Sequence, residues 1–259
     1  PKIVGVSLTG SEAAGAQVAS LAGKNVKPSV LELGGSDPMI VLDDADIEKV
    51  MNGTINGRLR NAGQACTSSK RIIVQEGIYD EYLKQITAYV NNMKVGDPTQ
   101  ADTNMGPVSS ETALVKLLDQ VNQSVEKGAK IVSGGKRIDR DGFFLEPTIL
   151  TEIKPGMKAY DEEIFGPVVC IWKVKDAEEA LKIANDTPFG LGASIYTKNV
   201  ELAQKLARRI DSGMVYVNKQ VSSSPELPFG GTKHSGYGRE LSKAGILEFL
   251  NKKLVMIAK

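Results

Sequence analysis

Residues 168–218 read VVCIWKVKDAEEALKIANDTPFGLGASIYTKNVELAQKLARRIDSGMVYVN, and in them short apolar runs alternate with longer amphipathic ones. We expect strands at 168–174, 193–197 and 214–218 and helices at 176–185 and 200–210. Asp176 and Glu179 have the spacing of a capping box at the start of the first helix. This β-α-β-α-β order favours a parallel sheet with right-handed crossovers, so the sequence predicts an α/β fold.

The remainder of the chain continues this alternation. We expect further strands at 3–8 and 30–33 and further helices at 11–23, 78–93 and 111–128. Gly23 stands where the first of these helices is expected to end, because glycine is common just after the last helical turn. The other two helices carry apolar residues at intervals of three and four, so each should turn one apolar face toward the core.

The composition indicates a soluble globular protein. With 259 residues, 41% of them hydrophobic and 24% charged, the chain can bury the core of one large domain or of one and a half. Its 32 Lys and Arg residues balance 31 Asp and Glu residues without any block of like charges. We therefore expect neither nucleic acid nor a membrane as a partner, and instead small molecules and protein subunits.

Two cysteines and one histidine restrict the chemistry further. Cys66, Cys170 and His234 are too few for a disulfide framework or a four-ligand zinc site, so we expect no metal and a reducing, cytoplasmic location. Cys170 lies inside the apolar run VVCIW and is expected to pack in the core as a small hydrophobic residue.

The first residues indicate a piece of a longer protein. The chain opens with Pro1 rather than Met and reaches an apparent strand within two residues. We therefore expect it to begin in the middle of a domain.

The stretch GQACTSSKR (63–71) surrounds Cys66 with small and hydroxyl-bearing residues, which predicts a loop that enters a helix. A helix N-terminus lowers the pKa of a thiol, and Lys70 or Arg71 would add to that effect. The local sequence leaves two interpretations open, a nucleophile and an inert cysteine.

A nucleophilic thiol needs a base. His234 lies in the glycine-rich stretch GGTKHSGYG and is expected to be a solvated side chain. Glu32, in LELGG (31–35), stands between two leucines, so we expect burial to raise its pKa toward neutrality and make it a candidate base. The alternative is a glutamate that caps a helix or pairs with a cation.

Five motifs together resemble the NAD(P)-dependent aldehyde dehydrogenase superfamily. They are LTGS (8–11), LELGG (31–35), GQACTSSKR (63–71), EEIFGPV (162–168) and PFGGTKHSGYGRE (228–240), in the order and with the spacing of that family. Within it, the chain is most similar to succinate-semialdehyde dehydrogenases.

The resemblance implies a catalytic pair. Cys66 matches the nucleophile that attacks the aldehyde carbonyl, and its own backbone N–H contributes to binding the resulting oxyanion. Glu32 matches the general base that activates water to hydrolyse the thioester. A glutamate in this place favours a free carboxylic acid as the product.

The resemblance also implies a cofactor site for NAD or NADP. Gly10 and Ser11 correspond to the turn and helix start that meet the cofactor pyrophosphate. Glu163 corresponds to the residue that binds the nicotinamide ribose, and Phe165 to the ring beside the nicotinamide. The alternatives are a surface acid for Glu163 and a core position for Phe165. The strand that distinguishes NAD from NADP lies outside this chain.

Arg60 indicates which substrate to expect. Succinate-semialdehyde dehydrogenases have an arginine at this position, where a guanidinium can bind a carboxylate through two hydrogen bonds. A similar serine-bearing loop would bring Ser223 or Ser224 to that carboxylate, with Phe229 on the tunnel wall. The alternatives are a surface salt bridge for Arg60, a non-specific aldehyde dehydrogenase, and a truncated fragment with residual thiol esterase activity.

The implied organisation has three parts. Residues 1–33 correspond to a remnant of the Rossmann-like cofactor-binding domain, 34–233 to the catalytic domain with its parallel α/β layer, and 234–259 to a C-terminal helix and an oligomerisation strand. Roughly the N-terminal half of the family's chain is missing, so we expect activity to require that half. The full-length form is expected to be a homodimer or homotetramer.

Overall fold

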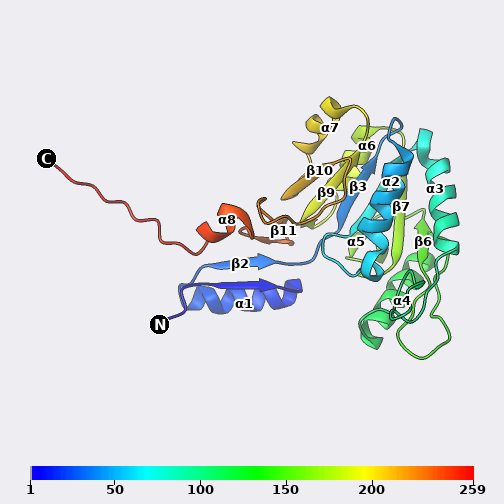
Figure 1. Cartoon of the computed structure of the whole chain (residues 1–259), viewed down its shortest axis with the longest axis horizontal. Helices are drawn as coiled ribbons and strands as arrows, with labels where there is room; N and C mark the ends of the chain where they lie inside the picture. Colours follow the sequence, from blue (N-terminus) through cyan, green and yellow to red (C-terminus); the bar gives the residue numbers. More distant parts are fainter. Residues whose placement is uncertain (1) are drawn as a thin grey trace.

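A seven-stranded sheet forms the body of the protein, in a computed structural model that describes residues 2–259 (Figure 1). Its strand order is β10-β9-β3-β4-β7-β6-β5. The strands are β3 (Asp37–Val41), β4 (Ser69–Gln75), β5 (Lys130–Ser133), β6 (Thr148–Thr151), β7 (Val168–Val174), β9 (Gly192–Tyr196) and β10 (Met214–Val217). All neighbours are parallel except β5, which runs antiparallel to β6 at one edge. The predicted α/β fold is therefore confirmed.

Helices cover both faces of this sheet, which is why its central strands carry continuous apolar runs, such as Met39–Val41 in β3 and Ile72–Val74 in β4. They are α2 (Ile47–Thr54), α3 (Glu76–Asn91), α4 (Glu111–Glu126), α5 (Lys158–Asp161), α6 (Ala177–Asn185) and α7 (Val200–Ala207). In β4 successive side chains point to opposite faces: Ile72 and Val74 pack with Tyr82 and Ile86 of α3, and Ile73 packs into the core on the other face.

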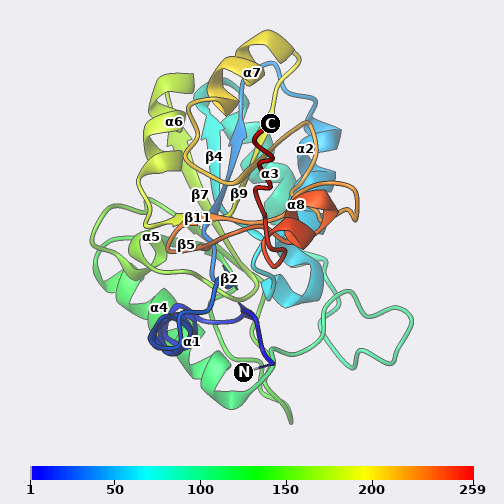
Figure 2. The same cartoon turned by 90° about the vertical axis from the view of Figure 1, so that its left-hand side faces the viewer.

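A smaller three-stranded sheet lies beside the main one (Figures 1 and 2). It contains β1 (Val6–Thr9), β2 (Ser29–Glu32) and β12 (Gly236–Tyr237), with α1 (Glu12–Lys24) connecting the two parallel strands. Because β12 comes from residues near the C-terminus, this sheet joins both ends of the chain. The domain limits at 33/34 and 233/234 stay a prediction.

The C-terminal residues extend away from the body of the protein (Figure 1). A short antiparallel pair, β8 (Phe189–Gly190) with β11 (Thr232–Lys233), precedes β12, and α8 (Ser242–Leu247) follows it. Residues 251–259 are exposed and form no helix or strand within the chain. An oligomerisation strand here would need a second subunit, so it too stays a prediction.

Several expected boundaries are wrong. The first strand begins at Val6, since Ile3 and Val4 are 72% and 65% exposed. Gly23 does not end α1, which continues to Lys24 and is capped by Asn25. Strands β3, β4, β5 and β6 were not expected from the sequence. Among residues 2–259, no helix is long and apolar enough to span a membrane.

The cap of α6 has the expected residues but a different arrangement. The Asp176 carboxylate accepts a hydrogen bond from the Glu179 N–H at 2.8 Å, as an N-cap does. The Glu179 carboxylate accepts from the N–H of Lys175 at 2.9 Å, one residue earlier than in a capping box.

Asp176→Ala should lower the free energy of unfolding by about 1 kcal/mol, because it leaves the Glu179 N–H without its acceptor. Urea denaturation of the 259-residue chain measures the change. Asp139→Ala, in an exposed loop without a cap, serves as the matched control and should be neutral. Equal effects of the two substitutions would contradict the capping role.

Candidate active site

Cys66 lies in a loop between a short 3-10 helix, Arg60–Gly63, and strand β4. The expected helix after Cys66 is therefore absent, and that prediction is wrong. The loop turns sharply at Gly63, whose φ is +69°, and a Cβ there would meet the carbonyl oxygen of Gly166 at 2.2 Å. A glycine at this position thus lets the Cys66 loop pack against the loop that carries Phe165.

The electrostatics of the thiol also differ from expectation. Cys66 is partly buried, and burial raises its pKa, whereas the Lys70 ammonium opposes the rise. The Asp37 carboxylate raises the pKa further, and the backbone N–H of Thr67 lowers it. No helix begins at Cys66, and among the groups of residues 2–259 that shift its pKa, Lys70 is the one cation that favours the thiolate.

Lys70 is one of the most enclosed charges in the chain. It is 2% exposed, and its Nζ donates to the carbonyl oxygens of Ala65 at 2.7 Å and Cys66 at 2.8 Å. The same Nζ lies 3.0 Å from Glu163 Oε1 in a salt bridge. Burial lowers the pKa of Lys70, and the Glu163 carboxylate raises it.

Glu32 ends β2 and is 2% exposed. Neither of its carboxylate oxygens has a hydrogen-bond partner among residues 2–259, so the alternative of a pairing or capping glutamate finds no support. Burial raises the pKa of Glu32 to about 7; Glu240 raises it further and Arg239 opposes the rise. The expectation of a pKa near neutrality agrees with this environment, and the carboxylate is close enough to influence the thiol of Cys66.

Cys170 and His234 lie where the sequence predicts them. Cys170 is fully buried in the core, and burial raises its pKa to about 11. The side chain of His234 is 64% exposed, and its Nδ1 lies 2.9 Å from the Glu12 carboxylate. Neither is positioned to act with Cys66.

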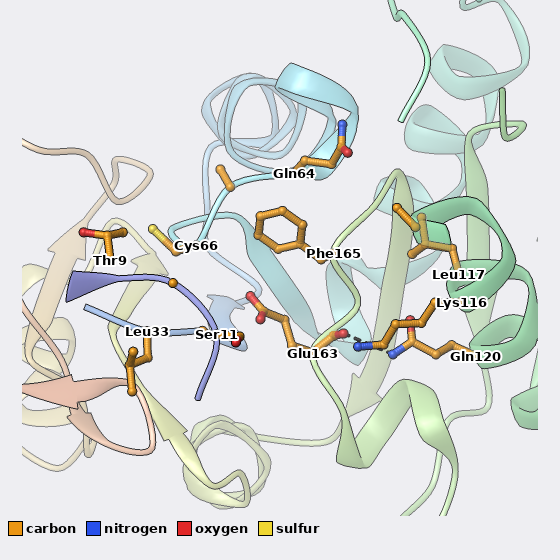
Figure 3. Close-up of a pocket in the computed structure, with 14 residues that line it drawn as sticks. Thr9, Ser11, Leu33, Gln64, Cys66, Lys116, Leu117, Gln120, Glu163 and Phe165 are labelled. Carbon is orange, nitrogen blue, oxygen red and sulfur yellow. Dashed lines mark hydrogen bonds between the residues drawn. The ribbon is translucent and has the colours of Figure 1, made fainter. Parts of the chain in front are cut away.

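A cavity of about 480 Å³ opens in front of Cys66. Its lining includes Thr9, Gly10, Ser11, Leu33, Gln64, Cys66, Lys116, Leu117, Gln120, Glu163 and Phe165 (Figure 3). In this view the Phe165 ring lies between the Cys66 segment and α4, and the Glu163 carboxylate lies between Ser11 and Phe165. The end of β1 and the start of α1, the Cys66 loop, α4 and the segment of Glu163 and Phe165 therefore meet around one space.

Glu163 and Phe165 present distinct chemical groups to this cavity. Glu163 Oε1 accepts from the Gly35 N–H at 3.1 Å and pairs with Lys70, which leaves its second oxygen without a protein donor among residues 2–259. Phe165 is 43% exposed, so it does not occupy the core position that was the alternative. A free carboxylate oxygen beside an exposed ring suits a ligand with hydroxyl groups and a flat heterocycle.

The start of α1 forms another wall of the cavity. Ser11 is the N-cap, and its Oγ accepts from the Ala14 N–H at 3.3 Å. Gly10 and Ser11 line the cavity. The unpaired N–H groups of a helix N-terminus favour an anionic group such as a phosphate.

A second cavity, of about 700 Å³, lies on the other side of the Cys66 loop. Arg60 and Ser223 line it together, and Ala65 lines both cavities. Ser224 and Phe229 are not among its lining residues: the Ser224 hydroxyl bonds the Glu226 carboxylate, and Phe229 packs in the small apolar cluster that also contacts Cys66. The structure thus brings Arg60 and Ser223 together, but not Ser224.

Sequence reasoning missed several residues of the site. Lys70 was noted only as a nearby cation, and no residue of the helix expected at 111–128 was placed at the site. Gln120 is 1% exposed, and its amide donates to Glu162 Oε2 at 2.8 Å and to the Glu163 carbonyl at 3.2 Å. Its position three residues after Leu117 and one before Val121, on the apolar face of α4, was the available signal.

Comparison with known proteins identifies the family. The model of the aldehyde dehydrogenase family matches residues 1–255. The chain is 48% identical over 255 residues to a succinate-semialdehyde dehydrogenase (NADP+) of Deinococcus radiodurans, covering 98% of this chain and 54% of the relative. A protein of the same name from Mycobacterium leprae is 45% identical over 258 residues, covering 100% of this chain and 56% of the relative.

A solved structure gives the same result. Succinic semialdehyde dehydrogenase from Streptococcus pyogenes, in complex with NADP+ as the cofactor, matches with a TM-score of 0.96 and 46% identity, covering 100% of this chain and 57% of that one. The chain therefore belongs to the aldehyde dehydrogenase family. It spans about half the length of the relatives it matches.

Glu32→Gln should stabilise the protein at high pH. The folded state holds a proton on Glu32 up to about pH 7, whereas the unfolded chain loses it near 4.5, so wild type loses stability as the pH rises through this window. Glutamine does not ionise, so the variant should keep its stability as the pH rises through this window. The gain in unfolding free energy should reach up to about 3 kcal/mol at pH 8 and vanish at pH 4.

Urea denaturation at pH 4 and pH 8 tests this prediction. The control is Glu126→Gln on an exposed position of α4, which should show no such pH dependence. A Glu32→Gln variant that parallels wild type at both pH values would contradict the buried, protonated carboxyl.

Arg58→Met should lower the free energy of unfolding by about 3 kcal/mol. The Arg58 guanidinium is fully buried, and methionine would leave its acceptors, among them the carbonyls of Val168 and Ile164, without donors. Thermal and urea unfolding measure the loss. Arg208→Met, at an exposed position after α7, is the control and should change stability by less than about 0.5 kcal/mol.

Proposed function

We propose that this chain is the catalytic part of an enzyme that oxidises succinic semialdehyde to the acid with NADP+. The observation that carries the proposal is the position of the Cys66 loop, which lines both a cavity with groups suited to a cofactor and a cavity with Arg60, while Cys66 itself lies within the electrostatic reach of Glu32. The names of the Deinococcus and Mycobacterium relatives support both the substrate and NADP.

Four residues would hold the cofactor. The start of α1 at Gly10 and Ser11 suits its pyrophosphate, the free oxygen of Glu163 suits ribose hydroxyls, and the exposed Phe165 ring suits the nicotinamide. Bound NADP+ would supply the hydride acceptor for the oxidation. Preference for NADP over NAD rests on the relatives, because none of these four residues contacts the adenine ribose in the proposed arrangement.

Cys66 supplies the nucleophile in the proposed reaction. Its thiolate forms a bond to the aldehyde carbon, the carbonyl oxygen becomes an oxyanion, and the N–H of Cys66 donates to it. After oxidation the acyl group remains on Cys66 as a thioester. The chain's own residues must then bring water to that carbon.

Glu32 serves as the general base for hydrolysis of the thioester. A carboxylate with a pKa of about 7 can take a proton from water near neutral pH and release it again. The resulting hydroxide attacks the thioester, the C–S bond breaks, and the acid leaves with the Cys66 thiolate restored.

Arg60 and Ser223 would select the substrate. They line the cavity on the far side of the Cys66 loop, and both are exposed to it. A guanidinium there can bind the second carboxylate of succinic semialdehyde through two hydrogen bonds, with the Ser223 hydroxyl as a further donor. Ser224 and Phe229 would take part only if the 223–229 loop moves.

The proposed activity belongs to a longer protein. Because the chain spans about half the length of its relatives, we infer that the other half completes the cofactor site. A homodimer or homotetramer remains our prediction for that full-length form.

Arg60→Ala tests the substrate proposal in a full-length enzyme that contains this chain. We expect kcat/KM for succinic semialdehyde to fall about 100-fold, as for loss of a charged hydrogen-bonding partner, with less than about threefold change for butyraldehyde. NADPH formation at 340 nm is the measurement, and Arg208→Ala is the control. Equal losses with both aldehydes would refute carboxylate binding by Arg60.

A further inference from the structure

Lys70 is a buried charge that the proposed reaction does not use. An ammonium has three N–H donors, and Lys70 has three acceptors, the carbonyl oxygens of Ala65 and Cys66 and the Glu163 carboxylate. Its side chain is 1% exposed. Enclosing a lysine so completely is costly unless all of its donors are satisfied, and here they are.

We propose that Lys70 is a positioning residue, which orients the two peptide groups that flank Cys66 and links them to Glu163. This inference rests on the proposed function of Cys66. It assigns to one side chain the relative placement of the thiol and of the carboxylate that faces the cofactor cavity.

The orientation follows from the geometry of the peptide bond. In a trans peptide the C=O and N–H groups point in opposite directions. Lys70 draws the Ala65 carbonyl inward, so the Cys66 N–H of the same peptide points away from the ammonium; it has no acceptor within residues 2–259 and can donate to an oxyanion. Lys70 thus aims the donor that the proposed reaction needs.

The next peptide obeys the same rule. Lys70 draws the Cys66 carbonyl inward, so the Thr67 N–H of that peptide points the other way, and this N–H lowers the pKa of the Cys66 thiol. The Thr67 N–H and the Lys70 charge both favour the thiolate. Removing Lys70 would therefore weaken two stabilising effects at once.

Other charged groups also lie near Cys66 and Lys70, and some of them affect the pKa of the thiol. The thiol also senses Asp37 and Glu32, which raise its pKa, while the ammonium faces Glu163, Asp37 and Arg58. The two acids oppose thiolate formation, so the loss of Lys70 leaves them without compensation.

Lys70→Met in the 259-residue chain tests the proposal, with the rate of iodoacetamide alkylation of Cys66 followed against pH. We expect the apparent pKa of the thiol to rise by about 1 unit and alkylation at pH 7.5 to slow about tenfold. Cys66→Ser identifies the labelled site, since Cys170 is fully buried. Thermal melting verifies that each variant is folded.

Three further variants sharpen the test. Lys70→Arg keeps the charge and donors and should alkylate within about threefold of wild type. Lys70→Gln keeps two N–H donors but loses the charge, so its Cys66 should be alkylated at a rate between those of the Lys70→Arg and Lys70→Met variants. If Lys70→Met does not fold, Lys70→Gln tests the positioning role in its place. Lys173→Met, a half-exposed lysine of β7, is the matched control and should leave the profile unchanged.

A profile for the folded Lys70→Met or Lys70→Gln variant that coincides with that of Lys173→Met overturns the positioning role. Alkylation requires neither aldehyde nor cofactor, so this outcome is independent of the proposed function. That function fails separately, if a full-length enzyme forms no NADPH from an aldehyde or still forms it after Cys66→Ser.

Discussion

The buried guanidinium of Arg58 holds together the segments on which the site depends. It donates to the carbonyls of Val168 at 2.8 Å and Ile164 at 2.9 Å and to the Ser68 hydroxyl at 2.9 Å. These contacts join the turn before Cys66, the loop after it, and the loop that leads from Glu163 into β7. Burial lowers the pKa of Arg58 to about 10, so the group stays charged at neutral pH.

Two further cations, adjacent in β4, extend this arrangement to both faces of the sheet. Lys70 binds the Cys66 loop and Glu163, while Arg71 donates to the carbonyl of Tyr160 at 2.8 Å and to that of Ile183 at 3.1 Å. Loops at the end of a sheet present carbonyl oxygens that no strand satisfies, and a buried cation with several donors satisfies them together. Unusually for a central strand, β4 therefore begins with polar residues.

The buried polar residues at the start of β4 explain which strands could be predicted from the sequence and which could not. Strands β7, β9 and β10 were expected because apolar runs are visible without knowledge of neighbours. Strand β4 was missed, and a helix was expected after Cys66, because Ser69, Lys70 and Arg71 resemble a solvated surface until their acceptors are known. The raised pKa of Glu32 was foreseen from its two leucine neighbours, since burial of a carboxylate requires only an apolar setting.

The sequence alone determined the α/β class, because that class depends on local periodicity. It also determined the family resemblance that points to Cys66, Glu32, Glu163 and Phe165, because the resemblance depends on the order of the motifs. Tertiary structure decided which groups face one another: Lys70 toward the Cys66 carbonyl, Arg60 with Ser223, and Gln120 beneath Glu163. Those contacts join residues from separate elements of the chain. Their geometry exists only once the sheets are assembled, because hydrogen bonds and electrostatic effects act over a few ångströms in space, whatever the distance along the sequence.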